Sequence, residues 1–268
     1  MKPIETITII GAGCVGTFLA QKLHNKGFVI NQIISKQKEY AEDLAFKVNA
    51  EVIPENFEGF NPNSDLYIVA VKDDVIMEIR KKFPLMDKMI VHTSGSVPMD
   101  VFKKSTPNFG VLYPLQTIIK ERELDISSIP FFITASNKET ADDLKQFANS
   151  FSNSVFEITD EKRAILHLAA VFASNFVNFQ LKIAKEIMEN DQLPYMVLRP
   201  LVEETISKAF DIDPGTAQTG PAKRGDCNII DKHKSLIKNP DQLALYTLLS
   251  DMIKKEYLDK KKSNKKKT

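Results

Sequence analysis

Residues 7–16 read ITIIGAGCVG, and this stretch decides the fold. The apolar run before the glycines has the composition of a buried strand, and apolar residues recur at helical spacing after them. In this context Gly11 allows a tight turn, Gly13 lets the backbone approach a pyrophosphate, and Gly16 lets helix and strand pack closely. The stretch therefore predicts a Rossmann-type dinucleotide site. A glycine-rich turn that binds nothing is the alternative.

The predicted cofactor site extends from this turn to the ends of the second and fourth strands. A helix that begins at the glycines presents free N–H groups and the positive end of its dipole, which suit a phosphate. We expect no metal, because the two cysteines have no metal-type spacing. The predicted cofactor-binding residues are Gly11, Ala12, Gly13, Cys14, Val15, Gly16, Ser35, Lys36, Val71 and Lys72.

The end of the second predicted strand decides between NAD and NADP. An NAD enzyme usually places a carboxylate about 20 residues after the glycine turn, where it binds the ribose hydroxyls. Ser35 and Lys36 occupy that position here. A hydroxyl and a cation favour the 2′-phosphate of NADP, which a carboxylate would repel. The sequence thus predicts NADP rather than NAD, with an ordinary solvated lysine as the alternative interpretation of Lys36.

The composition is that of a soluble globular protein, with 268 residues of which 43% are hydrophobic and 26% charged. No run approaches the ~20 uninterrupted apolar residues of a membrane span, and the first residues lead into a strand without a signal-peptide layout. We therefore expect a cytoplasmic protein that does not bind membranes. The net charge of +1 includes six lysines near the C-terminus, so the remainder carries −5, which does not favour nucleic-acid binding. These lysines are Lys260, Lys261, Lys262, Lys265, Lys266 and Lys267.

The pattern of the chain predicts two domains. Up to residue 158, strand and helix signals alternate, as a mainly parallel sheet with crossover helices requires. Beyond it the apolar period becomes helical, beginning with a long helix from the Thr159-Asp160 cap to about Glu189. We expect an α/β Rossmann-type domain at 1–158, an all-α domain at 159–258 and a disordered lysine-rich tail at 259–268.

The long helix carries the first candidate for a substrate site. At about 100° per residue, five polar side chains fall within a wedge of roughly 100°. Small apolar residues around the wedge indicate a helix contacted on most sides, where polar groups need partners and a ligand could be one. Solvent or partners in the core are the alternatives. The five side chains are His167, Ser174, Asn175, Asn178 and Lys182.

Three loops carry the other candidates. Residues 219–226, TGPAKRGD, contain Arg224, whose forked guanidinium fits a carboxylate or phosphate, although a surface Arg–Asp pair is the alternative. HTSG at 92–95 and YPLQT at 113–117 follow the fifth and sixth strands. Open parallel sheets bind ligands at the carboxyl ends of their strands, so both positions are informative.

With these motifs assembled, the chain resembles the Rossmann-like family that carries a C-terminal domain of unknown function 2520. The N-terminal part also resembles deazaflavin-dependent NADP reductases. The helical part is similar to the C-terminal domain of 6-phosphogluconate dehydrogenase, a fold shared with pyrroline-5-carboxylate reductase and ketopantoate reductase. These resemblances imply NAD(P)-dependent reduction of a small carbonyl or imine substrate, and a homodimer built through the helical domain. They rest on the glycine turn, HTSGS at 92–96, YPLQT at 113–117, HLAAVFASN at 167–175, TGPAKRGD at 219–226 and His233.

Two departures from the relatives bear on mechanism. Hydroxyacid dehydrogenases of this architecture commonly carry a catalytic lysine four residues before an asparagine. If that asparagine is Asn175, the position holds Val171. The family also often has a histidine where Tyr113 stands, which weakens an acid–base function there.

We therefore expect an NADP-dependent oxidoreductase whose substrate lies between the first domain and the polar wedge of the helix. His167 is the expected proton donor, because a free imidazole titrates near neutral pH, and His92 and His233 are alternates. Asn175 and Ser94 would hold the reacting oxygen or nitrogen, and Arg224 a substrate carboxylate. An NADP-binding sensor without turnover is the alternative function, and a methyltransferase fits the glycine spacing poorly.

Overall fold

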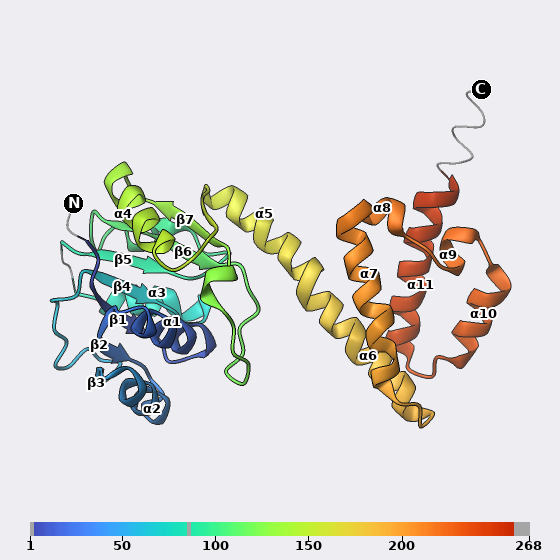
Figure 1. Ribbon diagram of the computed structural model, residues 1–268, viewed down its shortest axis with the longest axis horizontal. Coiled ribbons are helices and arrows are strands. Elements are labelled where there is room, and N and C mark those ends of the chain that lie inside the picture. Colours follow the sequence, from blue (N-terminus) through green and yellow to red (C-terminus); the bar gives the residue numbers. More distant parts are fainter. Residues whose placement is uncertain (1–2, 85–86, 260–268) are drawn as a thin grey trace. The chain divides into compact units, whose positions relative to one another are not determined.

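The computed structural model describes residues 3–84 and 87–259 (Figure 1). The chain divides into two compact units between Phe176 and Val177, and each unit is described by itself. Of the predicted lysine-rich tail, only Asp259 is described, and Lys260 to Lys267 lie outside the described residues.

Unit 1 is built on one sheet in the order β3-β2-β1-β4-β5-β6-β7-β8. The first six strands are parallel and have the order of doubly wound dinucleotide-binding folds, whereas β7 is antiparallel to β6. This confirms the predicted mainly parallel α/β fold. The strands are β1 (Thr6–Ile10), β2 (Val29–Ile34), β3 (Glu51–Ile53), β4 (Leu66–Val69), β5 (Met89–His92), β6 (Phe109–Pro114), β7 (Phe131–Ala135) and β8 (Val155–Glu157).

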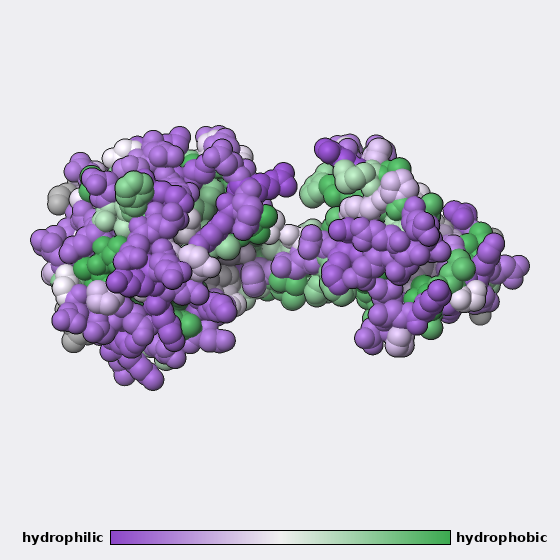
Figure 2. All heavy atoms as spheres, turned by 90° about the horizontal axis from the view of Figure 1, so that it is seen from below, coloured by the Kyte–Doolittle hydropathy of each residue, from purple (hydrophilic) through white to green (hydrophobic). Residues whose placement is uncertain are grey.

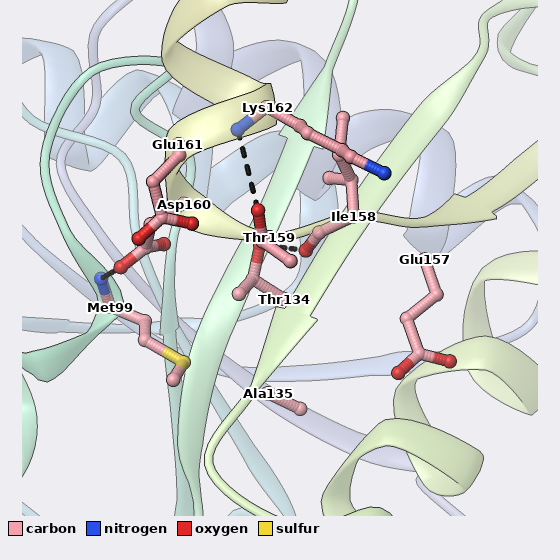
Figure 3. Close-up of a pocket in the computed structure, with 9 residues that line it drawn as sticks. All are labelled: Met99, Thr134, Ala135, Glu157, Ile158, Thr159, Asp160, Glu161 and Lys162. Carbon is pink, nitrogen blue, oxygen red and sulfur yellow. Dashed lines mark hydrogen bonds between the residues drawn. The ribbon is translucent and has the colours of Figure 1, made fainter.

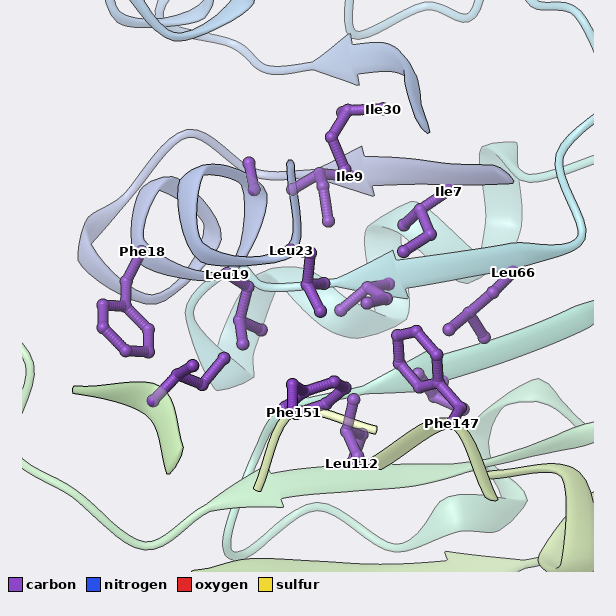
Figure 4. Close-up of a cluster of buried hydrophobic side chains, with 14 of the residues drawn as sticks. Ile7, Ile9, Phe18, Leu19, Leu23, Ile30, Leu66, Leu112, Phe147 and Phe151 are labelled. Atoms are coloured by element: carbon purple, nitrogen blue, oxygen red, sulfur yellow. The ribbon is translucent and has the colours of Figure 1, made fainter. Parts of the chain in front are cut away.

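Helices cover both faces of this sheet, because alternate strand residues point to opposite sides. Ile9 packs into one core with α1 (Cys14–Asn25), α2 (Lys38–Val48) and α4 (Lys138–Asn149) (Figure 4). Ile10 packs into the other with α3 (Asp73–Lys82) and the short helix η1 (Met99–Phe102). A further short helix, η2 (Ile126–Ser128), precedes β7.

A helical segment follows the sheet and crosses the boundary between the units. It consists of α5 (Asp160–Ala170), the π-helical turn η3 (Val171–Phe176) and α6 (Val177–Asn190). The predicted Thr159 cap is present, since its side chain accepts a hydrogen bond from the Lys162 N–H. The π turn interrupts the regular rotation of about 100° per residue, so the predicted wedge of five polar residues is not one straight stripe.

The sheet ends at Glu157, close to the domain boundary predicted at residue 158. Unit 1 continues to Phe176 because the first turns of α5 hydrogen-bond to the sheet and its loops. As a domain boundary, residue 158 stays a prediction.

Unit 2 is helical and buries few of its side chains. Among its described residues, only Ala217, Ala222, Ile230 and Ser250 are buried, and none of them belongs to α6 or α7. The loop predicted at 219–226 contains a short helix. After α6 the elements are η4 (Tyr195–Leu198), α7 (Arg199–Ile212), α8 (Pro214–Ala217), α9 (Pro221–Arg224), α10 (Cys227–Leu236), α11 (Pro240–Lys254) and η5 (Lys255–Asp259).

Many apolar side chains on the helices are exposed, and Figure 2 shows hydrophobic patches on the surface of the molecule. By length and composition alone, the helical segment Asp160–Asn190 could cross a membrane. One such helix is weak evidence, because the core helix of a globular protein passes the same test. The exposed apolar residues of this segment include Ile165, Leu168, Phe172, Phe176, Phe179 and Ile187.

Candidate active site

The glycine turn joins the carboxyl ends of three central strands. The Gly11 N–H donates to the Ile34 carbonyl of β2, and the Ala70 N–H after β4 donates to the Ile10 carbonyl of β1. Gly11 has a φ of +112°, and a Cβ there would collide with the Ala70 carbonyl. A Cβ on Gly16 would overlap the Gly11 carbonyl oxygen, so both glycines are required by close approach of backbone.

Gly13 differs from these two glycines because a Cβ there would meet nothing within 4 Å. Gly13 is exposed and precedes α1, whose first turn has no side-chain cap and no acidic residue. The first N–H groups of α1 thus have no side-chain cap, and the space beside Gly13 is open, as a bound pyrophosphate requires. Ala12 is buried, Val15 is half-buried and Cys14 is an exposed free thiol in the same turn. The residues present thus fit a dinucleotide.

The other predicted cofactor residues lie at the neighbouring strand ends. Val71 contacts the glycine turn, since its Cγ1 lies 2.9 Å from the position of a Gly11 Cβ. Lys72 is exposed and precedes α3. Half-buried Ser35 accepts a hydrogen bond from the Gln37 N–H at 3.2 Å, and Lys36 beside it is exposed. A hydroxyl and a solvated cation therefore border the end of β2, next to the Gly11 turn.

The loop after β5 is held rigidly by His92 and Ser94. His92 is fully buried, its Nδ1 accepts from the Ser94 N–H at 3.2 Å, and its Nε2 lies 3.3 Å from the Pro98 carbonyl oxygen. Burial, reinforced by the nearby Arg163 cation, lowers the pKa of His92 to about 4. The neutral ring is thus occupied by backbone partners, which suits a residue that positions the loop better than a proton donor.

The Ser94 side chain also holds this loop through hydrogen bonds. Its Oγ accepts hydrogen bonds from the Ser96 and Val97 N–H groups at 3.1 and 3.0 Å. Ser96 in turn donates to the Asp73 carboxylate at the start of α3. Ser94 is buried with an 8% exposed fraction, so its predicted contact with a reacting atom stays a prediction.

His167 and Tyr113 meet at the carboxyl end of β6. The Tyr113 hydroxyl lies 3.0 Å from His167 Nδ1, and the two rings are nearly perpendicular at 78°. Tyr113 is buried, which raises the pKa of its phenol, while the Arg163 charge acts in the opposite direction. His167 is half-buried and also packs on Gly95, where a Cβ would lie 2.6 Å from Nδ1. Absence of a side chain at Gly95 makes room for the imidazole.

The sheet order places these groups in one row. β1, β4, β5 and β6 are consecutive neighbours, so the glycine turn, Lys72 and Ser94 follow adjacent strand ends, and Tyr113 is the last residue but one of the next strand. An extended ligand with its pyrophosphate at Gly13 can therefore reach along the row toward the Tyr113–His167 pair. An imidazole and a phenol at one end of this row can transfer a proton, which reduction of a carbonyl or imine by hydride also requires.

The remaining predicted residues have local partners or face solvent. In unit 2, exposed Arg224 binds Asp226 through Nε and a terminal nitrogen, each at 2.8 Å, and His233 Nδ1 lies 2.9 Å from the Tyr246 hydroxyl. Asn175 is exposed on the π turn. The predicted functions of Arg224, His233 and Asn175 stay predictions.

A cavity of ≈ 580 Å³ lies elsewhere in unit 1, at the start of α5 (Figure 3). Carboxylates such as Glu157 and Glu161 line it together with Lys162, and no predicted site residue does. Its acidic lining does not suit a phosphate-bearing cofactor, so we place the candidate site at the strand ends.

Tyr113 is the functional candidate that sequence reasoning set aside. The comparison with a family histidine at that position weakened it, yet the structure joins its hydroxyl to His167 across 54 residues of sequence. The available signal was its position at the end of a buried strand beside HTSG. Pairing with a histidine on a distant helix could not be read from spacing.

Each of the two parts of the chain matches a known family model. Residues 6–95 match the model of coenzyme F420-dependent NADP oxidoreductases, and residues 129–253 match the domain of unknown function DUF2520. A search of curated proteins found no match.

Solved structures with the same fold cover nearly the whole chain. A Bacteroides fragilis protein, provisionally described as an NADP oxidoreductase, is 43% identical with a TM-score of 0.87, over 94% of this chain and 98% of that one. A Thermotoga maritima protein is 23% identical over 94% and 99%, with a TM-score of 0.76. A pyrroline-5-carboxylate reductase from Streptococcus pyogenes, 16% identical over 96% and 98% with a TM-score of 0.59, shares the fold alone. The chain therefore belongs to the NADP oxidoreductase-like family in which an F420-dependent-type Rossmann domain precedes a DUF2520 domain.

Proposed function

We propose that the protein is an NADP-dependent oxidoreductase that reduces a small carbonyl or imine compound. The single observation that carries the proposal is the hydrogen-bonded Tyr113–His167 pair at the carboxyl end of β6, in the same row of strand ends as the glycine turn. A protein that only senses NADP has no need of a half-buried proton donor at that position.

The chain's own residues bind the cofactor and manage one proton. When bound, NADPH supplies the hydride. Main-chain N–H groups after Gly13 would hold the pyrophosphate, and the hydrogen-bonded loop at Ser94 would border the substrate. Because the Tyr113 hydroxyl is the partner of His167 Nδ1, a doubly protonated His167 ring would give its Nε2 proton to the reacting oxygen or nitrogen and become neutral imidazole.

The preference for NADP rests on Ser35 and Lys36. A titration that follows nicotinamide fluorescence should give tighter binding of NADPH than of NADH. Lys36→Ala should weaken NADPH binding by roughly tenfold or more and leave NADH binding unchanged, because a charge-assisted contact to the 2′-phosphate is lost. Lys38→Ala is the matched control, since Lys38 is exposed two residues away and paired with Glu42 at 3.5 Å. Equal losses in both variants, or tighter NADH binding, would contradict the preference.

We also propose that the protein is a homodimer formed through its helices. The argument is that unit 2 buries only four described side chains, while large apolar residues on α6 and α7, such as Phe179, Leu201 and Phe210, are exposed. A second copy offers the same apolar surface, as a two-fold interface requires. Sedimentation equilibrium should give twice the chain mass of 30.2 kDa, and a monomer at micromolar concentration would refute this part.

The decisive experiment is a substrate screen. The protein is incubated with NADPH and a panel of small keto acids, cyclic imines and aldehydes while nicotinamide absorbance is followed. Oxidation of NADPH with formation of the reduced compound supports the proposal. Tight cofactor binding with no turnover across the panel would favour a sensor instead.

A further inference from the structure

Arg163 is the most unusual buried side chain in unit 1 outside the residues considered so far. It is a cation with an exposed fraction of 1%, and it lies in the first turns of α5. One terminal nitrogen donates to Thr134 Oγ1 at 2.8 Å and to Asp160 Oδ1 at 2.6 Å, and the other donates to the Val97 carbonyl. Burying a guanidinium costs stability even when it is paired, so a purely stabilising function is a poor explanation.

The partners of Arg163 come from three separate segments. Thr134 is on β7, Val97 is in the loop that continues from Ser94, and Asp160 starts α5. The other oxygen of Asp160 accepts from the Met99 N–H at 3.0 Å, and the Thr134 hydroxyl donates to the Ile158 carbonyl (Figure 3). Arg163 and Asp160 thus bind one end of α5 to the sheet and to the loop after β5.

The spacing along α5 connects this anchor to the candidate active site. Arg163 and His167 are four residues apart, so they lie on the same face of the helix. Arg163 contacts Val97, directly after the HTSGS loop, and His167 packs on Gly95 within that loop. A tilt or rotation of α5 would therefore move His167 relative to both Gly95 and Tyr113.

We infer that Arg163 is a positioning residue, which fixes α5 to the loop after β5 and to β7 and so holds His167 against Gly95 and in hydrogen-bonding distance of Tyr113. The relevance of Arg163 to a reaction rests on the proposed function. Its effect on the position of His167 can be tested without substrate or cofactor.

The charge of Arg163 acts on the same surroundings. Burial raises the pKa of Tyr113, and the Arg163 charge lowers it. Burial and the Arg163 charge both lower the pKa of His92. The other charged groups that act on His92 are Asp160 from α5 and Asp73 from α3, and both raise its pKa. Within the described residues, Arg163 Nε has no hydrogen-bond partner, so one donor of the buried guanidinium is unsatisfied although its charge is paired with Asp160.

The test uses the full-length protein with ¹³C-labelled histidine and tyrosine side chains. The chain has four histidines and six tyrosines, and the Tyr113→Phe variant assigns the cross-peak between the Tyr113 and His167 rings, whose centroids are 5.9 Å apart. Arg163→Lys and Arg163→Gln should each reduce this cross-peak at least twofold. Lys162→Gln, an exposed neighbour on the same turn, should leave it unchanged.

The two Arg163 variants also separate charge from geometry. Arg163→Gln should raise the His92 titration midpoint from about 4, whereas Arg163→Lys, which keeps the charge, should not. If Arg163→Gln does not fold, Thr134→Val removes one acceptor without leaving a charge unpaired, and it should also weaken the cross-peak.

Folded variants of Arg163 and Thr134 that keep the full cross-peak would overturn the inference. Because neither readout involves turnover, a failed substrate screen together with a lost cross-peak would refute the proposed function alone.

Discussion

Two tyrosine–histidine pairs in this chain have nearly the same geometry and different surroundings. The rings of Tyr113 and His167 have centroids 5.9 Å apart at 78°, and those of Tyr246 and His233 have centroids 5.9 Å apart at 79°. The first pair is part-buried beside the loop after β5, whereas the second is exposed on the helices of unit 2. Contact geometry therefore does not identify a catalytic pair. Burial and neighbouring groups separate the two.

Removing each imidazole should give the largest difference. On any substrate that the screen identifies, His167→Ala should lower kcat by roughly 10²-fold or more, which is the usual contribution of general acid catalysis. His233→Ala should cost less than about tenfold. Steady-state kinetics of both variants at saturating NADPH checks this, and a larger loss from His233→Ala would reverse the assignment.

Burial of His92 in unit 1 should make the stability of the folded protein depend on pH. The pKa of His92 in the folded protein, about 4, lies below its ordinary value of 6.5, so the unfolded chain binds more protons between these values. The stability that neutral His92 contributes is present above pH 6.5 and is lost as the pH falls toward 4. We expect a loss of about 3 kcal/mol in the unfolding free energy over this range.

Denaturant unfolding of the parent and of His92→Asn at pH 7 and pH 4 measures this contribution. The unfolding free energy of His92→Asn should fall less between pH 7 and pH 4 than that of the parent. Parallel pH profiles for the parent and His92→Asn would show that the imidazole is not buried in its neutral form.

A side chain at position 95 should displace His167 from Tyr113, although both rings of this pair remain in the protein. A Cβ on Gly95 would lie 2.6 Å from His167 Nδ1 and 3.0 Å from its Cβ, so the imidazole must move. Gly95→Ala should lower kcat by roughly tenfold or more, because small displacements of a catalytic group are costly. Gly13→Ala is the comparison variant, and it should impair NADPH binding rather than kcat. Gly27→Ala is unsuitable as a comparison because the positive φ of Gly27 would strain the backbone. Kinetics and cofactor titration separate the two outcomes.

The smallest effect should come from the hydroxyls. Tyr113→Phe removes the hydrogen bond to His167 and should lower kcat by roughly two- to tenfold, in line with the net value of one hydrogen bond. Tyr246→Phe removes the corresponding bond in unit 2 and should leave kcat unchanged. Equal effects in both variants would indicate that the pairs are functionally equivalent.

Sequence reasoning identified the parts of the fold whose signals are local. The ITIIGAGCVG stretch contains both the strand and the steric need for Gly11 and Gly16, and the Thr159 cap starts α5 as expected. The π turn at Val171–Phe176 was not foreseen, because a helix assumed to be regular has no signal for an inserted residue.

The candidate site was only partly predictable for a different reason. His167 and the HTSGS loop could be singled out by composition and position, but their pairing with Tyr113 depends on how α5 lies against the sheet. Arg163 fixes that arrangement through Val97 and Thr134, which are 66 and 29 residues away in sequence. Contacts over such distances depend on how helices and strands pack together. The periodic pattern of a single sequence predicts the elements but does not specify that packing.

The small number of buried side chains in unit 2 has a consequence for biosynthesis. The N-terminal unit leaves the ribosome first with two complete apolar cores, so it can fold while synthesis continues. The helices after Val177 emerge last with Phe179, Leu201 and Phe210 uncovered. If the proposed homodimer forms, these side chains stay exposed until two chains meet, so the yield of protein in a cell should fall when the concentration of chains is low.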